Sequence, residues 1–404
     1  MKLALFHPAF NTVGGAEILV AEQAKMYVRC GLDVRMVTFA HDAKTWDSRL
    51  GDLPVQVVKK RHWTDCFRSW SRLEKLMARG RRASEAFTDL DVVVAHNFPC
   101  SAMLGAFPMN ARRVWQCNEP PRNLHLRAAN PRMLERTTSH PEDPSLAIRD
   151  FRRALHRYDR NLRSNTALKT RHAFDLSACK HLDEIYAISE FSRDNARNIY
   201  GRCREEVIYP IVRFPNGGRN RHGLNRENLQ ILVHGRLDVY KNVDTVIQGF
   251  AHFHKRHPGA RLHVVGEGPL RAHLERLAED LVPGAVAFHG FLPESALREV
   301  YEACDVFSLL TLDEPFGMVF PEAAAKGLLL VGPDHGGPLE ILDGGRLGWV
   351  CDPFDPLALA DVFASILALS DAEVDTRREQ ADLACRSRFS EETLRPQLLS
   401  VLER

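Results

Sequence analysis

Two glutamates, Glu314 and Glu322, stand with seven residues between them in a stretch of apolar and glycine-rich sequence. An apolar strand is expected over 306–310, and a helix is expected over 318–326. Because the first amides of a helix lack intrahelical partners, they can receive an anion. The pattern predicts a strand–loop–helix unit with an anion-binding loop. The alternative is an ordinary unit in which Glu314 only caps the helix.

Two cations, Arg236 and Lys241, lie in the loop between a strand expected over 229–233 and a helix expected to begin near residue 242. An arginine that binds two oxygens at once and a lysine acting as a point charge are suited to a diphosphate. The alternative is a pair of solvated surface charges.

In the first half of the chain, His96 closes an apolar strand over 91–96, and Gly14 and Gly15 precede a helix over 16–29. Ligands of open parallel sheets bind beyond the carboxyl ends of the strands, which is where both features fall. Glycines also let backbone amides approach a ligand closely. A packed histidine and a structural turn are the alternatives.

The elements that position these residues alternate as strand and helix, which predicts parallel sheets with helices on both faces. The segment 130–144 is expected to be a loop, 147–180 a helix, and 207–210 a short strand. The polar, glycine-rich stretch 211–228 is expected to link two domains. We therefore expect a first domain over 1–210 and a second over 229–385.

Composition supports this division and excludes several classes. A chain of 404 residues predicts two domains, and 45% hydrophobic with 26% charged residues is typical of a soluble globular protein. No run of 18 apolar residues and no signal-peptide pattern occur, so a cytoplasmic protein is expected. The nine cysteines include no C-x-x-C pair, which favours a reducing compartment and argues against structural zinc. The loop at Gly266 does not continue as a dinucleotide fingerprint, which excludes a nicotinamide site.

Charge is divided unequally along the chain. Residues 1–200 contain 32 Lys and Arg against 22 Asp and Glu, whereas residues 201–404 contain 22 against 30. Within 59–87, nine cations alternate with Trp63, Phe67 and Trp70 at helical spacing. Such a helix can lie on an anionic membrane surface, and the alternative is a helix that packs its apolar face on the sheet.

Several of these motifs resemble those of retaining glycosyltransferases of the GT-B fold, specifically glycosyltransferase family 4. They are the E-x7-E of Glu314 and Glu322, the following GG-x-x-E, the GGAE at Gly14, the G-R-L-x-x-x-K-N that contains Arg236 and Lys241, and the S-E-F at Ser189. The resemblance implies an α/β fold of two Rossmann-like doubly wound parallel-sheet domains that face a cleft. It also implies that the last helix, 386–404, crosses back onto the first domain.

The resemblance implies roles for individual residues. The catalytic candidates are Glu314, His96, Arg236 and Lys241. The donor-binding candidates are Gly15, Arg236, Lys241, Gly266, Phe291, Leu292, Glu314, Phe316, Gly317, Met318, Val319 and Glu322. The acceptor-binding candidates are Asn118 and Arg122, in a segment that usually reads H-x-P-P-R.

The expected function is transfer of a sugar from a UDP- or GDP-linked donor to a glycan or lipid-linked acceptor. Neither a cofactor nor a metal is expected, nucleic acid is not an expected partner, and peripheral attachment to a membrane through 59–87 is expected. Three alternatives stay open. They are a soluble small-molecule acceptor, a non-catalytic sugar-nucleotide binding protein, and a phosphorylase that would hold pyridoxal phosphate near Lys326.

Overall fold

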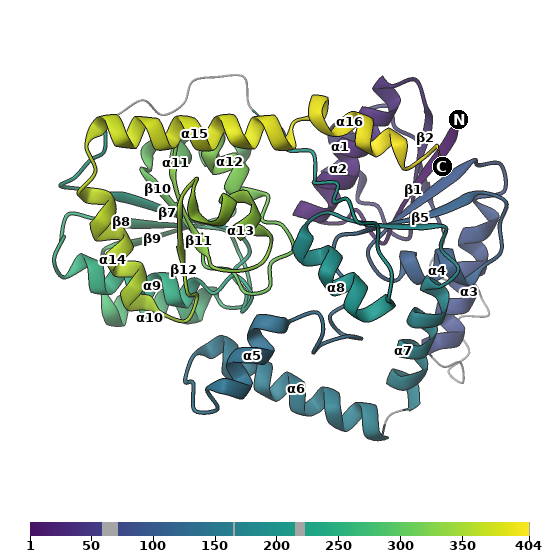
Figure 1. Cartoon of the computed structure of the whole chain (residues 1–404), viewed down its shortest axis with the longest axis horizontal. Helices are drawn as coiled ribbons and strands as arrows, with labels where there is room; N and C mark the ends of the chain where they lie inside the picture. The colour runs from purple at the N-terminus through teal and green to yellow at the C-terminus, as the bar shows by residue number, and fades with distance from the viewer. Residues whose placement is uncertain (59–71, 165, 215–222, 404) are drawn as a thin grey trace. The chain divides into compact units, whose positions relative to one another are not determined.

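The computed structural model describes residues 1–58, 72–164, 166–214 and 223–403, and the chain divides into two compact units (Figure 1). The first unit comprises Met1–Ala129, Leu155–Ile211 and Glu391–Arg404, and the second comprises Asn130–Ala154 and Val212–Ser390. Helix α6 (Leu146–Ser164) carries the chain from the second unit back into the first.

The first unit is built on a six-stranded sheet in the order β3-β2-β1-β4-β5-β6, with every pair parallel. Its strands are β1 (Lys2–His7), β2 (Asp33–Thr38), β3 (Val55–Val57), β4 (Val92–His96), β5 (Arg112–Cys117) and β6 (Glu184–Ala187). Its helices are α1 (Gly15–Arg29), α2 (Ala43–Leu50), α3 (Arg72–Glu85), α4 (Cys100–Ala106), α7 (Thr166–Cys179), α8 (Glu190–Tyr200) and α16 (Glu391–Ser400).

The second unit repeats this plan with the order β12-β11-β10-β7-β8-β9, again all parallel. Its strands are β7 (Gln230–His234), β8 (Arg261–Val265), β9 (Val286–Gly290), β10 (Val306–Ser308), β11 (Leu329–Pro333) and β12 (Trp349–Cys351). Its helices are α5 (Pro131–Ser139), α9 (Val243–His254), α10 (Arg271–Leu281), α11 (Glu294–Ala303), α12 (Val319–Ala325), α13 (Gly337–Ile341), α14 (Pro356–Leu367) and α15 (Asp371–Phe389).

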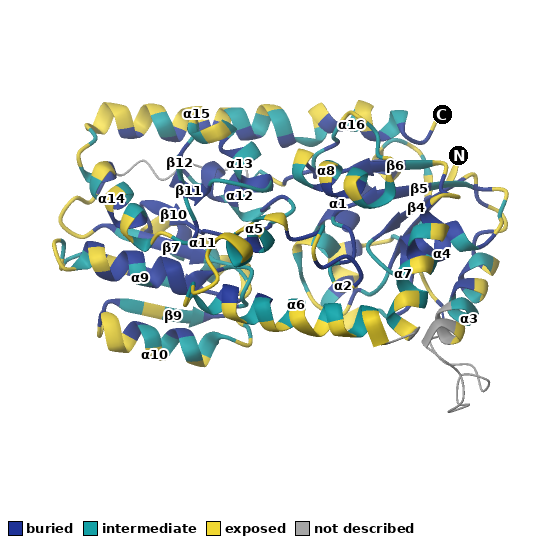
Figure 2. Cartoon of the chain, turned by 60° about the horizontal axis from the view of Figure 1, so that its bottom comes forward, coloured by how far each residue is buried: buried dark blue, intermediate teal, exposed yellow. Residues whose placement is uncertain are grey.

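Helices cover both faces of each sheet, so the central strands are buried on both sides (Figure 2). All five residues of β4 are buried, as are all five of β11, which explains why these strands read as continuous apolar runs rather than alternating ones. The prediction of two doubly wound α/β units is confirmed.

Both sheets have the strand order of the dinucleotide-binding fold, in which successive strands are added in one direction from the first central strand and then in the opposite direction from the second. The reversal lies between β1 and β4 in the first unit and between β7 and β10 in the second. Loops that follow these two strands diverge to opposite faces of the sheet and leave a crevice at its carboxyl edge, the usual ligand position of such folds. The candidates Gly15 and His96 follow or end these strands in the first unit, and Arg236, Lys241 and Glu314 follow them in the second.

The segment 130–154 departs from the predicted organisation. We expected a loop over 130–144 within the first domain, but residues 131–139 form α5 and pack in the second unit. Pro131 at the first helical turn suits a helix start, and the cap of this helix comes from Asp313, far along the sequence. The predicted helix over 147–180 is divided into α6 and α7, with residue 165 outside the described part.

Of two other predicted elements, the strand over 207–210 does not form and the helix over 59–87 lies in part outside the described residues. No strand forms over 207–210, where the Ile208 N–H donates to the Ala187 carbonyl (3.0 Å) and Pro210 has no N–H to extend a ladder. Most of the predicted cationic-aromatic helix, including Trp63, Phe67 and Trp70, lies outside the described residues, which resume at α3. Within the described residues, no helix has the length and apolar content needed to cross a membrane.

Candidate active site

In the second unit, an ion pair forms where β7 and β10 end side by side. Beyond these paired strands, Lys241 Nζ lies 2.6 Å from Glu314 Oε2. The two side chains are only 22% and 17% exposed, so water weakens the pair less than it would on the surface. The structure thus brings together two of the predicted catalytic residues.

The loop that presents Lys241 is held by local hydrogen bonds. The carboxylate of Asp238 accepts from the N–H of Tyr240 (3.0 Å), which tightens the turn. Asn242 is fully buried with a left-handed φ of 51°, and its amide nitrogen donates to the carbonyls of Leu310 (3.0 Å) and Pro353 (2.7 Å). Asn242 therefore ties the lysine loop to the chain that leads from β10 to Glu314.

Glycines let the neighbouring loops approach this pair. Gly337 N–H donates to the Glu314 carbonyl (2.9 Å), and a Cβ at Gly337 would lie 2.3 Å from the Pro315 carbonyl oxygen. Gly266 has a φ of 131°, and a Cβ there would lie 1.9 Å from the Gly235 carbonyl oxygen. Gly266 is thus required for packing of the β8 loop against the β7 loop.

Glu322 lies on α12, beyond the loop containing Gly317, whose φ is 95°. Burial raises the pKa of Glu322 to about 7, and within the described residues its carboxylate has no hydrogen-bond partner. Its charge in turn helps to raise the pKa of Tyr301, after the larger effect of burial. The Glu322 carboxylate is therefore placed to gain from a ligand that donates hydrogen bonds.

Tyr301 connects Glu322 to the end of β7. The Tyr301 hydroxyl lies 2.9 Å from Nδ1 of His234, the last residue of that strand. Burial, and then the nearby charge of Lys241, lower the pKa of His234 to about 4. His234 is thus neutral at pH 7 and can accept the Tyr301 proton. Neither residue was singled out from the sequence, where a histidine at a strand end before Gly235 was the available signal.

The remaining candidates of the second unit are placed as follows. Arg236 is 73% exposed and pairs only loosely with Asp238 (3.5 Å), so in this structure it does not join Lys241. Phe291 follows β9 and is 74% exposed, with Leu292 beside it. Phe316 is buried and packs edge-on against Phe389 (5.2 Å between ring centroids), so it is a core residue. Met318 and Val319 begin α12 and are partly exposed.

In the first unit, His7 and His96 end the two central strands, and their ring centroids lie 6.4 Å apart. His96 is fully buried, and neither ring nitrogen has a hydrogen-bond partner within the described residues. Burial, with the nearby His7, holds the pKa of His96 well below its usual value. His7 Nε2 also lies 3.4 Å from Oε1 of Glu17, in the first turn of the helix that starts at Gly15. The neutral, unpartnered His96 is the most direct sign of a ligand position in this unit.

Asn118 belongs to a buried hydrogen-bond network. Its side-chain nitrogen donates to Asn97 Oδ1 (3.2 Å), next to His96, and its own oxygen accepts from Gln116 (3.5 Å). The network continues from Gln116 through Tyr186 to Gln23 on α1. Arg122 Nε binds Glu119 Oε2 (2.6 Å). Asn118 thus holds the loop that follows His96, a connection between residues too distant in sequence to be predicted.

No group of three or more histidine, cysteine or carboxylate side chains is placed to bind a metal ion, as far as the described residues extend.

Comparisons with known proteins agree with the fold and with the motifs. Residues 13–214 match the family described as Glycosyltransferase Family 4, and residues 218–382 match Glycosyl transferases group 1. A mannosylfructose-phosphate synthase of Agrobacterium fabrum is 36% identical over 34% of this chain and 32% of its own length. A GDP-mannose-dependent phosphatidylinositol monomannoside mannosyltransferase of Mycolicibacterium smegmatis is 32% identical over 40% of this chain and 43% of its own length.

The chain thus spans about a third to a half of the length of the curated relatives it matches. Among solved structures, Anabaena HepE in complex with UDP and glucose has a TM-score of 0.70 at 20% identity, covering 99% of both chains. This likeness extends over both units and confirms the predicted GT-B fold class.

The pKa of Glu322 predicts a pH-dependent effect of substitution. Because the folded-state pKa of about 7 exceeds the ordinary 4.5, ionising this carboxyl opposes folding progressively from pH 4.5 to 7 and fully above. We expect Glu322→Gln to raise the free energy of unfolding at pH 8 by about 1–2 kcal/mol, less than the full shift implies because the side chain is only partly buried. At pH 4.5 the difference should nearly vanish.

Urea denaturation at the two pH values, with the exposed Glu299→Gln as the matched control, measures this difference. An equal change at both pH values would contradict the burial of an ionisable Glu322.

Proposed function

Because the chain belongs to glycosyltransferase family 4, we propose that it transfers a sugar from a nucleoside-diphosphate sugar to an acceptor hydroxyl, with retention of configuration at the anomeric carbon. The observation that supports this function most directly is the Lys241–Glu314 pair at the carboxyl edge of the second sheet (2.6 Å). A cation for a diphosphate and a carboxylate for hydroxyl groups stand together at the usual ligand position of this fold.

The donor would occupy the crevice at β7 and β10. Lys241 would bind the diphosphate, and Arg236, which is exposed and loosely paired, would turn toward it. Glu322, whose carboxylate lacks a partner, would accept hydrogen bonds from the ribose, and the backbone near Phe291 and Leu292 would contact the base. Glu314 would hold hydroxyl groups of the transferred sugar.

The first unit carries candidate binding groups of its own. The neutral His96, with both ring nitrogens unpartnered, would bind a sugar hydroxyl, and the helix start at Gly15 would bind phosphate oxygens. Asn118 and Arg122 would contact the acceptor.

The reaction proposed is a same-face substitution. The bond between the anomeric carbon and the phosphate oxygen breaks, the acceptor oxygen bonds to that carbon, and its proton passes to the departing phosphate. Negative charge therefore grows on the diphosphate in the transition state, where Lys241 can stabilise it. No metal is needed in this scheme, and full activity in EDTA is the expected result.

The donor would carry UDP or GDP. HepE was solved with UDP and glucose, and the Mycolicibacterium relative is named for GDP-mannose. The test is a screen of purified protein for nucleotide release from UDP-, GDP- and ADP-sugars, alongside a thermal shift with each. Binding without release would favour a non-catalytic sugar-nucleotide protein, and no response to any donor would overturn the proposal.

The acceptor would be a glycan or a lipid-linked molecule at an anionic membrane surface. Besides the segment 59–87, helix α6 carries five exposed arginines at helical spacing, Arg149, Arg153, Arg157, Arg160 and Arg163. Each cation near an anionic bilayer contributes about 1 kcal/mol, so such a face supports reversible, salt-sensitive attachment.

We expect Lys241→Ala to lower kcat/KM for the donor by about 10- to 150-fold, because it removes a charge-assisted contact of about 1.5–3 kcal/mol. Arg236→Ala should lower it less, since an exposed cation loses much of its interaction energy to water. The control is Lys255→Ala, an exposed lysine next to α9. Unchanged kinetics for Lys241→Ala at sub-saturating donor would remove the diphosphate-binding role.

Co-sedimentation with phosphatidylglycerol vesicles tests the membrane proposal. We expect the protein to pellet with vesicles at low salt and to be released at high salt. Reversing three charges on α6 (Arg153→Glu, Arg157→Glu, Arg160→Glu) should weaken pelleting more than reversing Lys255, Arg256 and Arg276, which are also exposed. If folded protein stays in the supernatant at low salt, a soluble acceptor becomes the better proposal.

A further inference from the structure

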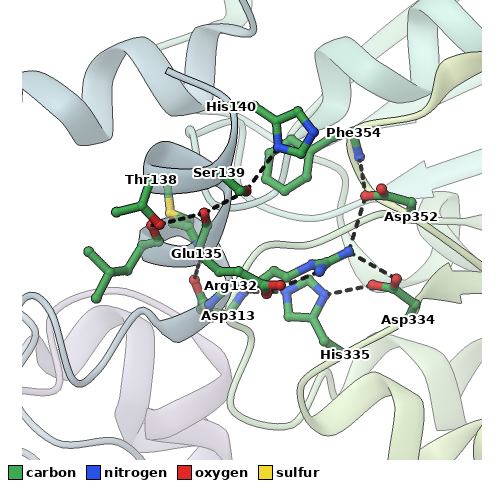
Figure 3. A network of polar contacts seen from close by, with 12 residues as sticks. Arg132, Glu135, Thr138, Ser139, His140, Asp313, Asp334, His335, Asp352 and Phe354 are labelled. Carbon is green, nitrogen blue, oxygen red and sulfur yellow. Dashed lines mark hydrogen bonds and ion pairs between the residues drawn. The ribbon is translucent and has the colours of Figure 1, made fainter. Parts of the chain in front are cut away.

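The residue before Glu314 is an aspartate with an unusual environment. Asp313 is fully buried, and its φ of 49° lies in the left-handed region, which non-glycine residues rarely adopt. Burying a carboxylate is costly unless it is paired or hydrogen-bonded. The groups that satisfy the Asp313 carboxylate also fix the backbone just before Glu314. They are drawn around Asp313 in Figure 3.

Helix α5 supplies hydrogen bonds to this carboxylate. Asp313 Oδ1 accepts from the N–H of Arg132 (3.0 Å), and Oδ2 accepts from the N–H of Met133 (3.1 Å). The first N–H groups of a helix need acceptors from elsewhere, and an aspartate is among the preferred ones. The cap of α5 and a buried charge thus satisfy each other, although they come from segments 181 residues apart.

The side chain of Arg132 makes a second connection. Its guanidinium lies 3.0 Å from Asp334 Oδ2 and 3.4 Å from Asp352 Oδ1, at the ends of β11 and β12. His335 Nε2 accepts the backbone N–H of Asp313 (3.0 Å), and its Nδ1 lies 3.2 Å from Asp334. His335 therefore carries its proton on Nδ1, and the ring links Asp313 to the carboxylate that Arg132 binds.

Asp313 is thus held through both its backbone and its side chain, while Glu314 is held at its carbonyl by Gly337 N–H (2.9 Å) and at its carboxylate by Lys241. We propose that Asp313, with helix α5, is a positioning element that sets the Glu314 carboxylate for the transferred sugar. This inference rests on the proposed function, because it assigns to α5 the sugar half of that donor site. Within the described residues, α5 itself makes no hydrogen bond or ion pair with the side chain of Lys241 or Glu322.

The proposal separates two parts of donor binding. Moving Asp313 displaces Glu314, which is proposed to bind sugar hydroxyls, but leaves Glu322 and the β9 end, which are proposed to bind the nucleoside. A substitution of Asp313 should therefore lower the affinity for a nucleoside-diphosphate sugar more than the affinity for the nucleoside diphosphate alone. If Asp313 had a purely structural role, its substitution would lower the affinity for both ligands to the same extent.

The experiment measures calorimetric affinities of wild type and Asp313→Ala for UDP-glucose against UDP and for GDP-mannose against GDP. We expect Asp313→Ala to lower the sugar-to-diphosphate affinity ratio of the accepted pair about tenfold, since hydrogen bonds to a charged acceptor are lost. Asp313→Asn should recover part of the ratio, because its amide oxygen still accepts one N–H.

Asp343→Ala is the matched control. Asp343 also has a left-handed φ, of 52°, but it is partly exposed and pairs with Arg346 at the surface. Asp343→Ala therefore places an alanine at a similar left-handed φ, with similar backbone strain, but keeps the cap of α5. We expect this variant to leave the sugar-to-diphosphate affinity ratio unchanged.

An unchanged ratio in Asp313→Ala, or an equal change in Asp343→Ala, would overturn the positioning role. If wild type binds neither sugar nucleotide, the proposed function itself fails, which is a separate result. Should Asp313→Ala not fold, Arg132→Ala carries the test, because it keeps both amides and removes the contacts to Asp334 and Asp352. A ratio lowered about threefold supports the proposal and an unchanged one overturns it.

Discussion

Two adjacent carboxylates, Asp313 and Glu314, each need hydrogen bonds or a counter-charge, and their partners come from different parts of the second unit. Asp313 is fully buried and Glu314 is 17% exposed, so neither can rely on water for its solvation. The amides of α5 satisfy the first, and Lys241 pairs with the second. The loops after β7, β10 and β11 therefore converge on two consecutive residues.

The strand order explains why this convergence happens at one edge of the sheet. In a parallel sheet every strand ends at the same edge, and the reversal of the strand order between β7 and β10 sends the following helices to opposite faces. The same order in the first unit places His7 and His96 at equivalent strand ends. One constraint of chain topology thus creates two polar sites, and what each can bind depends on the few side chains that follow the central strands.

The sequence predicted the fold class, which is confirmed, and it proposed the loops of the candidate site, because both inferences follow from local signals. Apolar runs bounded by glycine identify buried parallel strands, and the charged residues after them identify the carboxyl edge. The capping of α5 by Asp313 was not predictable, since the two segments lie 181 residues apart and each alone reads as ordinary. A second carboxylate directly before Glu314, within an apolar stretch, was the one available hint that a buried charge needed a partner.

Arg236 and Phe316 show that a motif predicts the position of a residue better than the direction of its side chain. Both belong to matching motifs, yet one side chain is 73% exposed and the other is packed in the core against Phe389. A motif marks the position of a backbone segment, whereas the direction of each side chain depends on neighbours from other parts of the chain. His234 and Tyr301 are held together by such a contact, across 67 positions of sequence.

Because Asn130–Ala154 packs within the second unit although it lies between segments of the first, the order of synthesis matters for this chain. Residue 132 leaves the ribosome 181 residues before Asp313, an interval of roughly 10–40 s at a rate of about 5–20 residues per second. During that time α5 has no cap and Arg132 has neither Asp334 nor Asp352 to bind. During synthesis this short helix therefore lacks its stabilising tertiary contacts until more than half of the second unit has been made.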